Sequence, residues 1–291
     1  MSRPQPQPFP APSGPAPRVT VVVTTRNEER NIPAFLDALD AQTLPRSLFR
    51  VILVDNHSTD RTQELAKGRV DAILTLGPER STQRNAGIRA ATTPYVIYLD
   101  ADMRLSPGVL AECLATLEGH PGRVALYIPE TVVGSGYWIR VRNFERSFYD
   151  ATPIDAVRFV RRDAFLAAGG FDETIYAGED WDLDIRLASQ GAFGIVRSPL
   201  FHDEGAFSFR RYLRKKAYYS ASFTDYRAKW PDHPNVRRQF SVWYRFLGVF
   251  LENGKWRRFL SRPDLAAGMY LLRFLVGLTY LLHRRRSRAK S

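Results

Sequence analysis

The sequence has a single cysteine, Cys113, among its 291 residues. A disulfide bond within the chain is therefore excluded, and this content is typical of proteins that fold in a reducing compartment. Cys113 lies in a predicted helix, and we interpret it as a small core residue and not as a nucleophile. The apolar core of a signal peptide is also missing from residues 1–17, which are rich in Pro, Gln, Ser and Ala. We expect a disordered tail there and a cytoplasmic location for the rest of the chain.

Acidic residues are scarce near the end of the chain. Residues 1–205 carry 22 Lys and Arg against 26 Asp and Glu, a net charge of −4, whereas residues 206–291 carry 20 against 4, a net charge of +16. The overall charge of +12 therefore comes from the last segment alone. Such an asymmetry predicts a polyanionic partner for residues 206–291, either nucleic acid or anionic lipid.

Residues 18–205 have the pattern of an α/β domain. Apolar runs over residues 19–24, 51–54 and 95–99 predict strands that are buried on both faces, as in a parallel sheet. The remaining predicted elements are helices over 31–41, from 60, 80–90, 106–117 and 179–190, and strands over 124–128 and 192–196. Asn31, Asp60 and Ser106 are predicted to cap three of these helices.

Two carboxylates, Asp100 and Asp102, follow the strand at 95–99 with only Ala101 between them. Ligands of parallel α/β sheets bind beyond the carboxyl ends of the strands, so both side chains lie where a ligand is expected. Carboxylate oxygens suit Mg²⁺ or Mn²⁺, which in turn hold phosphates. The pattern indicates a site for a divalent metal and a nucleotide, and the alternative is a loop with two solvated acids.

Other polar motifs occur along the chain, and two of them directly follow predicted strands. In order along the chain they are Thr24, Thr25, Arg26, Asn27 and Glu28, then Asp55, then Arg80, Gln83 and Arg84, then the Asp100 motif, and later Gly178, Glu179 and Asp180. This ordered set resembles the inverting family-2 glycosyltransferases of the GT-A fold. The resemblance covers roughly residues 18–205 and implies a Rossmann-like, mostly parallel sheet flanked by helices.

The resemblance also implies how the donor is held. A sugar would move from a nucleotide-diphosphate donor, expected to be a UDP-sugar, with the loop at residues 24–28 contacting the nucleotide and Asp55 holding the base. The family pattern after the second strand is close to V-D-D-G-S-x-D, and here Asn56 and His57 replace the second Asp and the Gly. We expect His57 to be an exposed loop residue without a role.

The metal site is expected to centre on Asp102, with Mn²⁺ or Mg²⁺ as the cofactor. Asp100 is expected to reach the ribose or a metal-bound water. Ala101, which lies between the two aspartates, is expected to contact the nucleotide-sugar donor. Many relatives have a histidine after the last strand that completes the metal site, and His202 stands there. Neutral imidazole is a good ligand for Mn²⁺, and the alternative is a loop histidine with no role.

A general base and an arginine pair complete the expected site. Asp180 opens a predicted helix, where the helix dipole favours an anion, and the resemblance favours it as base over the neighbouring Glu179. Arg80 and Arg84 lie one helical turn apart and can both face the diphosphate, unless they form a solvated basic face. The roles of two further side chains are left open. Gln83 could serve in place of an arginine, and Trp181 could lie near the sugar and acceptor or in the core.

The C-terminal segment contains two apolar runs, at 240–251 and 265–282. Eighteen helical residues span about 27 Å, so a transmembrane helix at 265–282 is possible. Arg273 would then lie mid-span, at a cost of roughly 2.5–3.5 kcal/mol. We therefore expect two helices lying in the cytoplasmic leaflet, with basic flanks on anionic headgroups. The alternative is a buried helical hairpin.

These observations predict an inverting, metal-dependent glycosyltransferase of the hexosyltransferase class. Its acceptor is expected to be a lipid-linked or membrane-proximal hydroxyl in cell-envelope glycan or glycolipid synthesis, at the cytoplasmic face of the membrane. The alternatives are a soluble transferase with a non-lipid acceptor, a sugar-binding relative without activity, and a basic nucleic-acid-binding protein. The long apolar runs argue against nucleic acid as the partner.

Overall fold

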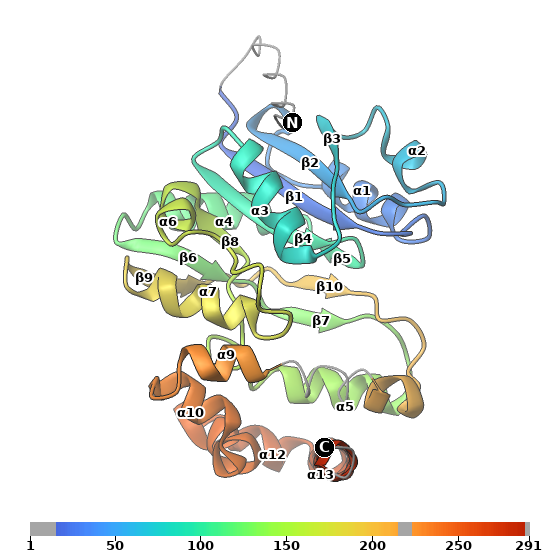
Figure 1. Cartoon of the computed structure of the whole chain (residues 1–291), viewed down its shortest axis with the longest axis vertical. Helices are drawn as coiled ribbons and strands as arrows, with labels where there is room; N and C mark the ends of the chain where they lie inside the picture. Colours follow the sequence, from blue (N-terminus) through green and yellow to red (C-terminus); the bar gives the residue numbers. More distant parts are fainter. Residues whose placement is uncertain (1–15, 215–222, 289–291) are drawn as a thin grey trace.

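A computed structural model describes residues 16–214 and 223–288, with side chains up to residue 279. Most of the expected Pro-rich tail, part of the basic stretch after residue 208 and the side chains of the terminal arginine cluster therefore lie outside the described residues. Two sheets, the helices that flank the larger one and a layer of C-terminal helices make up the described part (Figure 1). This arrangement is an α/β fold with a mostly parallel central sheet, as the sequence predicts.

The central sheet has seven strands in the order β3-β2-β1-β4-β8-β6-β9. Their bounds are β1 Val19–Thr25, β2 Phe49–Asp55, β3 Ala72–Thr75, β4 Tyr95–Asp100, β6 Arg123–Tyr127, β8 Phe159–Arg161 and β9 Ala192–Ile195. β1 pairs in parallel with β2 and β4, β2 with β3, and β6 with β9. β8 runs antiparallel to both β4 and β6. The parallel strands at the centre are mostly apolar, as expected for strands whose two faces are both covered by helices.

Helices pack on both faces of this sheet. They are α1 Ile32–Asp40, α2 Thr62–Ala66, α3 Arg80–Ala90, α4 Val109–Glu118, α6 Arg162–Ala167 and α7 Glu179–Ala188, with a 3₁₀ turn η1 at Arg46–Leu48. One apolar core lies between the sheet and α1 and α4, and a second lies between the sheet and α3, α6 and α7. Cys113 is buried in the first core, in agreement with its interpretation as a core residue.

Two of the expected helix caps differ in the structure. Ser106 does not cap α4, because the helix begins at Val109 with Gly108 as the capping residue and no side chain makes a cap hydrogen bond. Asn31 directly precedes α1, but its side chain donates to Glu28 and caps no backbone N–H. Asp60 does accept the backbone N–H of Thr62 at the start of α2.

A small second sheet was not predicted from the sequence. It contains β5 Met103–Leu105, β7 Glu130–Val132 and β10 Leu200–His202, in the order β5-β10-β7. It lies between the central sheet and the C-terminal helices (Figure 1). Each strand is only three residues long, which is too short for a periodic signal in the sequence. Its register sets His202 opposite Met103, so that β10 ends beside the Asp102 turn.

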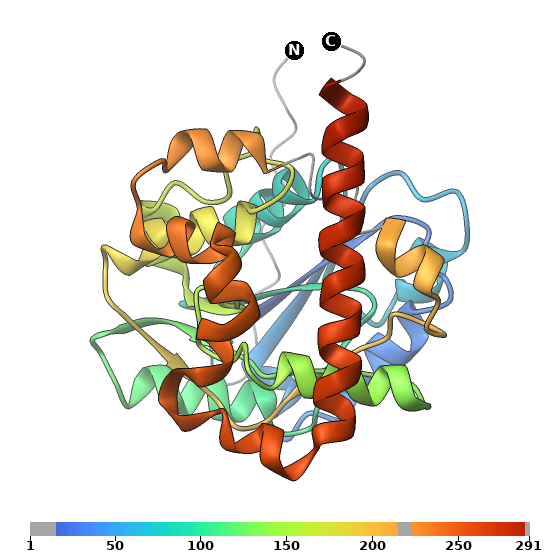
Figure 2. The same cartoon turned by 90° about the horizontal axis from the view of Figure 1, so that it is seen from below.

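The C-terminal helices form a layer, and the part of it between residues 244 and 272 packs against α5 Tyr137–Arg146. They are α9 Thr224–Lys229, α10 Pro234–Phe240, the π-helical turn η2 Tyr244–Gly248, α11 Val249–Leu251, the 3₁₀ turn η3 Glu252–Gly254, α12 Arg257–Ser261 and α13 Pro263–Arg288. Figure 2 shows α13 as one long helix crossing this end of the molecule. Buried residues of a third core come from α5 and from both expected apolar runs: Val141, Phe148, Tyr244, Val249, Phe250, Leu265, Met269 and Leu272.

This packing changes the interpretation of the two apolar runs. We expected both to meet lipid, but one side of each run packs against α5 as protein core. Arg273 points inward, because its guanidinium forms an ion pair with Glu145 at 3.0 Å and its side chain is 8% exposed. Among the described helices, none combines the length and the apolar character that a membrane span requires.

Candidate functional site

The carboxyl ends of β1, β2 and β4 meet at one edge of the central sheet. The parallel register sets Thr24 opposite both Val54 and Asp100. Thr24 Oγ1 donates to Asp100 Oδ1 at 2.8 Å, and Thr25 Oγ1 donates to Asp55 Oδ1 at 2.8 Å. The motifs at the ends of the three strands are therefore joined directly by hydrogen bonds.

Asp55 organises the loop that comes after β2. Its carboxylate accepts from Ser58 N at 2.8 Å, from Ser58 Oγ at 2.5 Å and from Gln63 Nε2 at 2.7 Å. Burial by itself would raise the pKa of Asp55, but these hydrogen bonds outweigh it and lower the pKa. His57 in this loop is exposed and adopts φ 50°, so it keeps the left-handed backbone for which glycine is the usual residue.

The loop after β1 forms the other wall of this edge. Asn27 also adopts a left-handed conformation, with φ 55°, and its backbone N–H donates to Ser58 Oγ at 2.8 Å. Glu28 N donates to Thr62 Oγ1 at 2.7 Å, which ties the loop to α2. Burial raises the pKa of Glu28, and the charges of Asp102 and Asp100 raise it further. Arg26 is exposed at the rim of the loop.

Arg84 lies wholly inside the site and joins two of the expected carboxylates. Its Nη2 lies 3.0 Å from Asp100 Oδ1 and its Nη1 lies 2.9 Å from Asp180 Oδ1. The side chain is 1% exposed, and its guanidinium packs over the rings of Tyr98 and Phe171. Arg84 therefore lies beneath the site, where it holds the two carboxylates together. This burial differs from the expectation that Arg84 faces the diphosphate.

Arg80 is the arginine that stays at the surface of the site. Its Nη1 lies 3.3 Å from Asp100 Oδ2 and its Nη2 lies 3.4 Å from Glu179 Oε1, with 43% of the side chain exposed. Burial would raise the pKa of Asp100, but the guanidiniums of Arg84 and Arg80 hold it well below the usual range. Gln83 does not serve beside Arg80, since its Nε2 donates to Val54 O at 2.6 Å inside the protein.

The expected metal ligands Asp102 and His202 lie together. His202 Nε2 is 3.1 Å from Asp102 Oδ2, and His202 Nδ1 is 2.5 Å from Glu130 Oε1. Glu130 also pairs with Arg146. Burial lowers the pKa of His202, but the hydrogen bonds to both carboxylates outweigh it and raise the pKa. The sequence did not reveal Glu130, because its position depends on the small sheet.

The residues of this cluster fit a divalent metal. Asp102 Oδ1 is buried without a hydrogen-bond partner in the described part of the chain, which is costly unless a ligand satisfies it. Glu130 accepts from one ring nitrogen of His202, an arrangement that orients the other ring nitrogen toward a metal. No group of three or more potential metal-binding side chains occurs among the described residues. Such a metal would take its remaining ligands from phosphate and water, as Mg²⁺ commonly does.

The expected base, Asp180, and its alternative, Glu179, lie at the start of α7. Gly178 adopts φ 87° directly before the helix, and Glu179 and Asp180 occupy its first turn. Glu179 is 6% exposed, and burial together with the charge of Asp180 raises its pKa to about 7. Asp180 is more accessible, since 23% of its side chain is exposed against 9% of the Glu179 side chain. The two adjacent carboxylates therefore differ sharply in environment.

Arg158 is a second buried guanidinium beside Asp180, and the sequence did not single it out. Its Nη1 lies 3.9 Å from Asp180 Oδ2, and this atom has no hydrogen-bond partner among the described residues. Burial opposes the charge of Arg158, but Asp180 and other carboxylates outweigh it and raise the pKa. The residue directly precedes β8, whose antiparallel position next to β4 could not be read from local pattern.

Trp181 is half-buried and packs against an apolar cluster that includes Ile185 and Tyr226. Its ring stacks on Phe223 with centroids 5.4 Å apart, and its Nε1 donates to Ile154 O at 3.2 Å.

A cavity of about 190 Å³ lies between the starts of α3 and α7. Its lining includes Arg80, Tyr176 and Glu179. This is the space next to the exposed arginine of the site.

Two family models match the chain. The model described as Glycosyl transferase family 2 matches residues 20–167, and the one described as Glycosyl transferase family group 2 matches residues 95–283. An uncharacterized glycosyltransferase of Mycobacterium tuberculosis is 34% identical over 188 residues, which are 60% of this chain and 80% of that protein. Both family models include the Asp100 motif.

Solved structures share the fold at low sequence identity. The mannosyltransferase PcManGT from Pyrobaculum calidifontis, in complex with GDP-Man and Mn²⁺, aligns with a TM-score of 0.60 at 21% identity, over 95% of this chain and 89% of that one. TarS 1–349 of Staphylococcus aureus, in complex with UDP-GlcNAc, aligns with a TM-score of 0.53 at 16% identity, over 94% and 92%. This chain spans 45% of the longer TarS structure. The fold is therefore GT-A-like.

Proposed function

Because this chain belongs to glycosyl transferase family 2 and is a glycosyltransferase, we propose that it transfers a hexose from a UDP-sugar to an acceptor hydroxyl with inversion. The observation that carries this proposal is the bridge from Asp100 through Arg84 to Asp180. It sets the candidate base beside the strand end from which the Asp102 turn projects. A base and a donor site must be adjacent for a direct displacement at the anomeric carbon.

The nucleoside is proposed to bind against the loops after β1 and β2. Support comes from the convergence of Thr25, Asn27 and Asp55 at one edge of the sheet, where ligands of such sheets bind. The proposal of a uridine nucleotide rests on the similarity to TarS, whose solved complex contains UDP-GlcNAc. PcManGT is described with GDP-Man, so the base is the point that a nucleotide panel must test.

The donor diphosphate is proposed to bind between Arg80 and the Asp102–His202 pair, with Mn²⁺ or Mg²⁺ as cofactor. A metal bound there would supply Lewis-acid stabilisation of the leaving diphosphate. Arg80 adds a second positive charge from the exposed side of the site. Asp100 is held by Arg84 and Arg80, and its role is to keep both guanidiniums in place.

Asp180 is proposed as the general base. Its carboxylate takes the proton of the acceptor hydroxyl while the acceptor oxygen forms a bond to the anomeric carbon. The bond from that carbon to the diphosphate breaks, and the diphosphate leaves with the electron pair. Attack from the face opposite the leaving group inverts the anomeric configuration. Arg84 and Arg158 hold Asp180 in one orientation from two sides.

The acceptor is proposed to be lipid-linked or membrane-proximal, in cell-envelope glycan or glycolipid synthesis at the cytoplasmic face of the membrane. Support comes from the net charge of +16 over residues 206–291, which favours an anionic surface. The related TarS of Staphylococcus aureus is named a poly(ribitol-phosphate) β-N-acetylglucosaminyltransferase. A soluble acceptor is the alternative that acceptor assays would distinguish.

The proposal is tested by thermal shift of the full chain with UDP, GDP and other nucleoside diphosphates, each with and without Mn²⁺. We expect the largest stabilisation by UDP with Mn²⁺, because ligands that bind the native state raise its stability. Asp102→Ala should abolish the Mn²⁺-dependent part of the shift. Asp232→Ala is the matched control, since this carboxylate is exposed and outside the site. Stabilisation by UDP that is independent of Mn²⁺ would contradict the metal assignment.

A further inference from the structure

The outer side of the C-terminal layer carries apolar side chains at helical spacing. Around η2 and α11, Trp243, Leu247 and Leu251 succeed one another at four-residue intervals and are 64%, 46% and 50% exposed. This spacing aligns them on one face of a helix. Buried residues such as Tyr244 and Phe250 occupy the opposite side and belong to the third core. The segment is therefore apolar on both sides, and only one side has a partner among the described residues.

Helix α13 repeats this pattern. Leu271, Phe274 and Leu278 lie at spacings of three and four residues and are 49%, 63% and 43% exposed. The inward side of the same helix carries Met269 and Leu272, which are buried against α5. A helix at the surface of a soluble domain normally turns polar residues outward. An outward apolar stripe on α13 is thus a second exposed apolar surface.

The two stripes belong to one face of the molecule. Tyr270 Oη of α13 donates to Phe246 O of η2 at 2.9 Å, so the two segments lie side by side. The intervening chain adds Trp256 and Leu260, which are 43% and 74% exposed. Figure 2 looks onto this end of the molecule, with α13 and the segment from α10 to α12 in front. Of the fourteen large hydrophobic residues exposed in the described chain, nine lie between residues 242 and 278, so exposed apolar side chains are concentrated in this segment.

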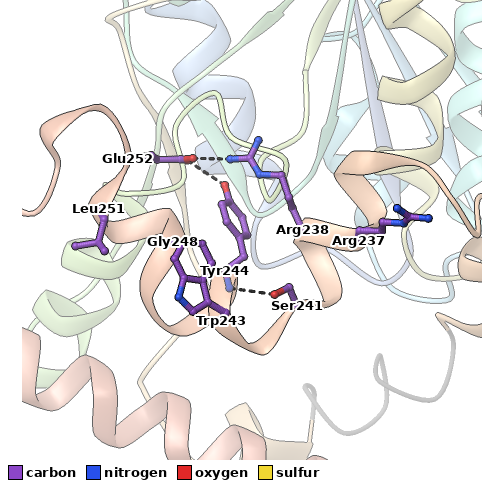
Figure 3. A pocket seen from close by; sticks show the side chains of 8 residues that line it. All are labelled: Arg237, Arg238, Ser241, Trp243, Tyr244, Gly248, Leu251 and Glu252. Atoms are coloured by element: carbon purple, nitrogen blue, oxygen red, sulfur yellow. Dashed lines mark hydrogen bonds and ion pairs between the residues drawn. The ribbon is translucent and has the colours of Figure 1, made fainter.

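Basic side chains accompany the apolar stripes. Arg257 and Arg258 are exposed beside Trp256, and Arg262 lies at the end of α12. A cavity of about 590 Å³ opens next to the first stripe, and Figure 3 shows Arg237, Trp243 and Leu251 around it. Cations beside tryptophan and leucine are the composition of surfaces that enter the headgroup region of anionic membranes.

We infer that this face, defined by Trp243, Leu247, Leu251, Leu271, Phe274 and Leu278, docks onto an anionic lipid bilayer. The apolar stripes enter the boundary between headgroups and acyl chains, and the arginines contact the lipid phosphates. A second copy of this chain is a poorer occupant, because it would bring two strongly basic regions together. The inference rests on the proposed membrane-proximal acceptor and names the surface that would bring the enzyme to it.

The test is co-sedimentation of the full chain with vesicles of equal parts phosphatidylglycerol and phosphatidylcholine. Two variants remove the stripes separately: Trp243→Glu with Leu247→Glu, and Phe274→Glu with Leu278→Glu. We expect each to weaken vesicle binding by at least about tenfold, because each removes apolar contact and adds negative charge. The matched control is Leu166→Glu with Ile195→Glu, two exposed residues outside this face that change the charge equally. This control should bind vesicles as the wild type does.

Thermal unfolding and UDP binding in the absence of vesicles separate this inference from the proposed function. Retained UDP binding with lost vesicle binding supports the docking face. Absence of UDP binding by the wild type would contradict the proposed donor. It would not affect the conclusion drawn from the vesicle experiment. Equal vesicle binding by the wild type and both stripe variants would overturn the inference. Binding to pure phosphatidylcholine vesicles that is as strong as binding to the anionic vesicles would also overturn it. A further contrary outcome is a wild-type dimer that dissociates in the stripe variants, with no binding to vesicles.

Discussion

The guanidinium of Arg84 lies 2.9 Å from the carboxylate of Asp180, although the two residues are 96 positions apart in the sequence. The same guanidinium reaches Asp100 at the end of β4. One buried side chain thus connects the donor edge of the central sheet with the first turn of α7. The relationship predicts that stability and catalysis depend together on Arg84.

Arg84→Met is expected to destabilise the protein strongly. Removing one member of a buried ion pair leaves uncompensated charge, at a cost of about 3–5 kcal/mol. Arg80→Met is the matched control, because Arg80 binds Asp100 from the exposed side and should cost less than about 1 kcal/mol. Chemical denaturation of both variants measures the difference. Equal losses in the two variants would show that burial of Arg84 is not decisive.

Glu130 is predicted to act on the metal through His202. Glu130→Gln retains size but weakens the hydrogen bond that orients the ring, and such changes typically reduce metal affinity about 10–100-fold. Titration of Mn²⁺ binding in the presence of UDP, monitored by the electron paramagnetic resonance signal of the free ion, measures this directly. His202→Ala should reduce the affinity at least as much. Unchanged Mn²⁺ affinity in both variants would place the metal elsewhere.

Two conservative variants separate the base from its neighbour. Asp180→Asn is expected to lower kcat by at least ~10²-fold with donor affinity nearly unchanged, because general base catalysis typically contributes that much. Glu179→Gln should retain most of the activity. If Glu179→Gln is the inactive variant and Asp180→Asn is active, the roles of the two carboxylates are reversed.

Glu179 also makes stability depend on pH. Its pKa is raised from 4.5 to about 7 in the folded protein, so the native state binds more protons than the unfolded state between these pH values. The free energy of unfolding should therefore fall as pH rises from 4.5 toward 7, by roughly 3 kcal/mol at most. Glu179→Gln should lack this part of the pH dependence. Denaturation curves of both proteins at several pH values test the sign and the range.

Two neighbouring residues of α13 distinguish its two sides. Leu272 is 1% exposed and packs against α5, so Leu272→Ala should cost about 2–5 kcal/mol. Phe274 is 63% exposed, and Phe274→Ala should change the stability by less than about 0.5 kcal/mol. Thermal or chemical unfolding measures both. Equal and small effects would mean that α13 is not part of the protein core.

The sequence by itself determined five of the seven strands of the central sheet, all but β3 and β8, and the order of the motifs at the edge of that sheet. Apolar runs and turn residues act locally, so β1, β2, β4 and α3 could be predicted within about two residues. The Asp100 motif also carries its meaning locally, because two carboxylates directly after a buried strand can only lie at its carboxyl end.

Only the tertiary structure decided which distant side chains meet. The three-residue strands of the small sheet have no periodic signal, yet they bring Glu130 to His202 and His202 to Asp102. Arg158 meets Asp180 because β8 inserts antiparallel beside β4, a pairing that depends on the whole sheet. The apolar composition of α13 likewise could not reveal which side faces α5, since both sides are apolar and only packing distinguishes Leu272 from Phe274.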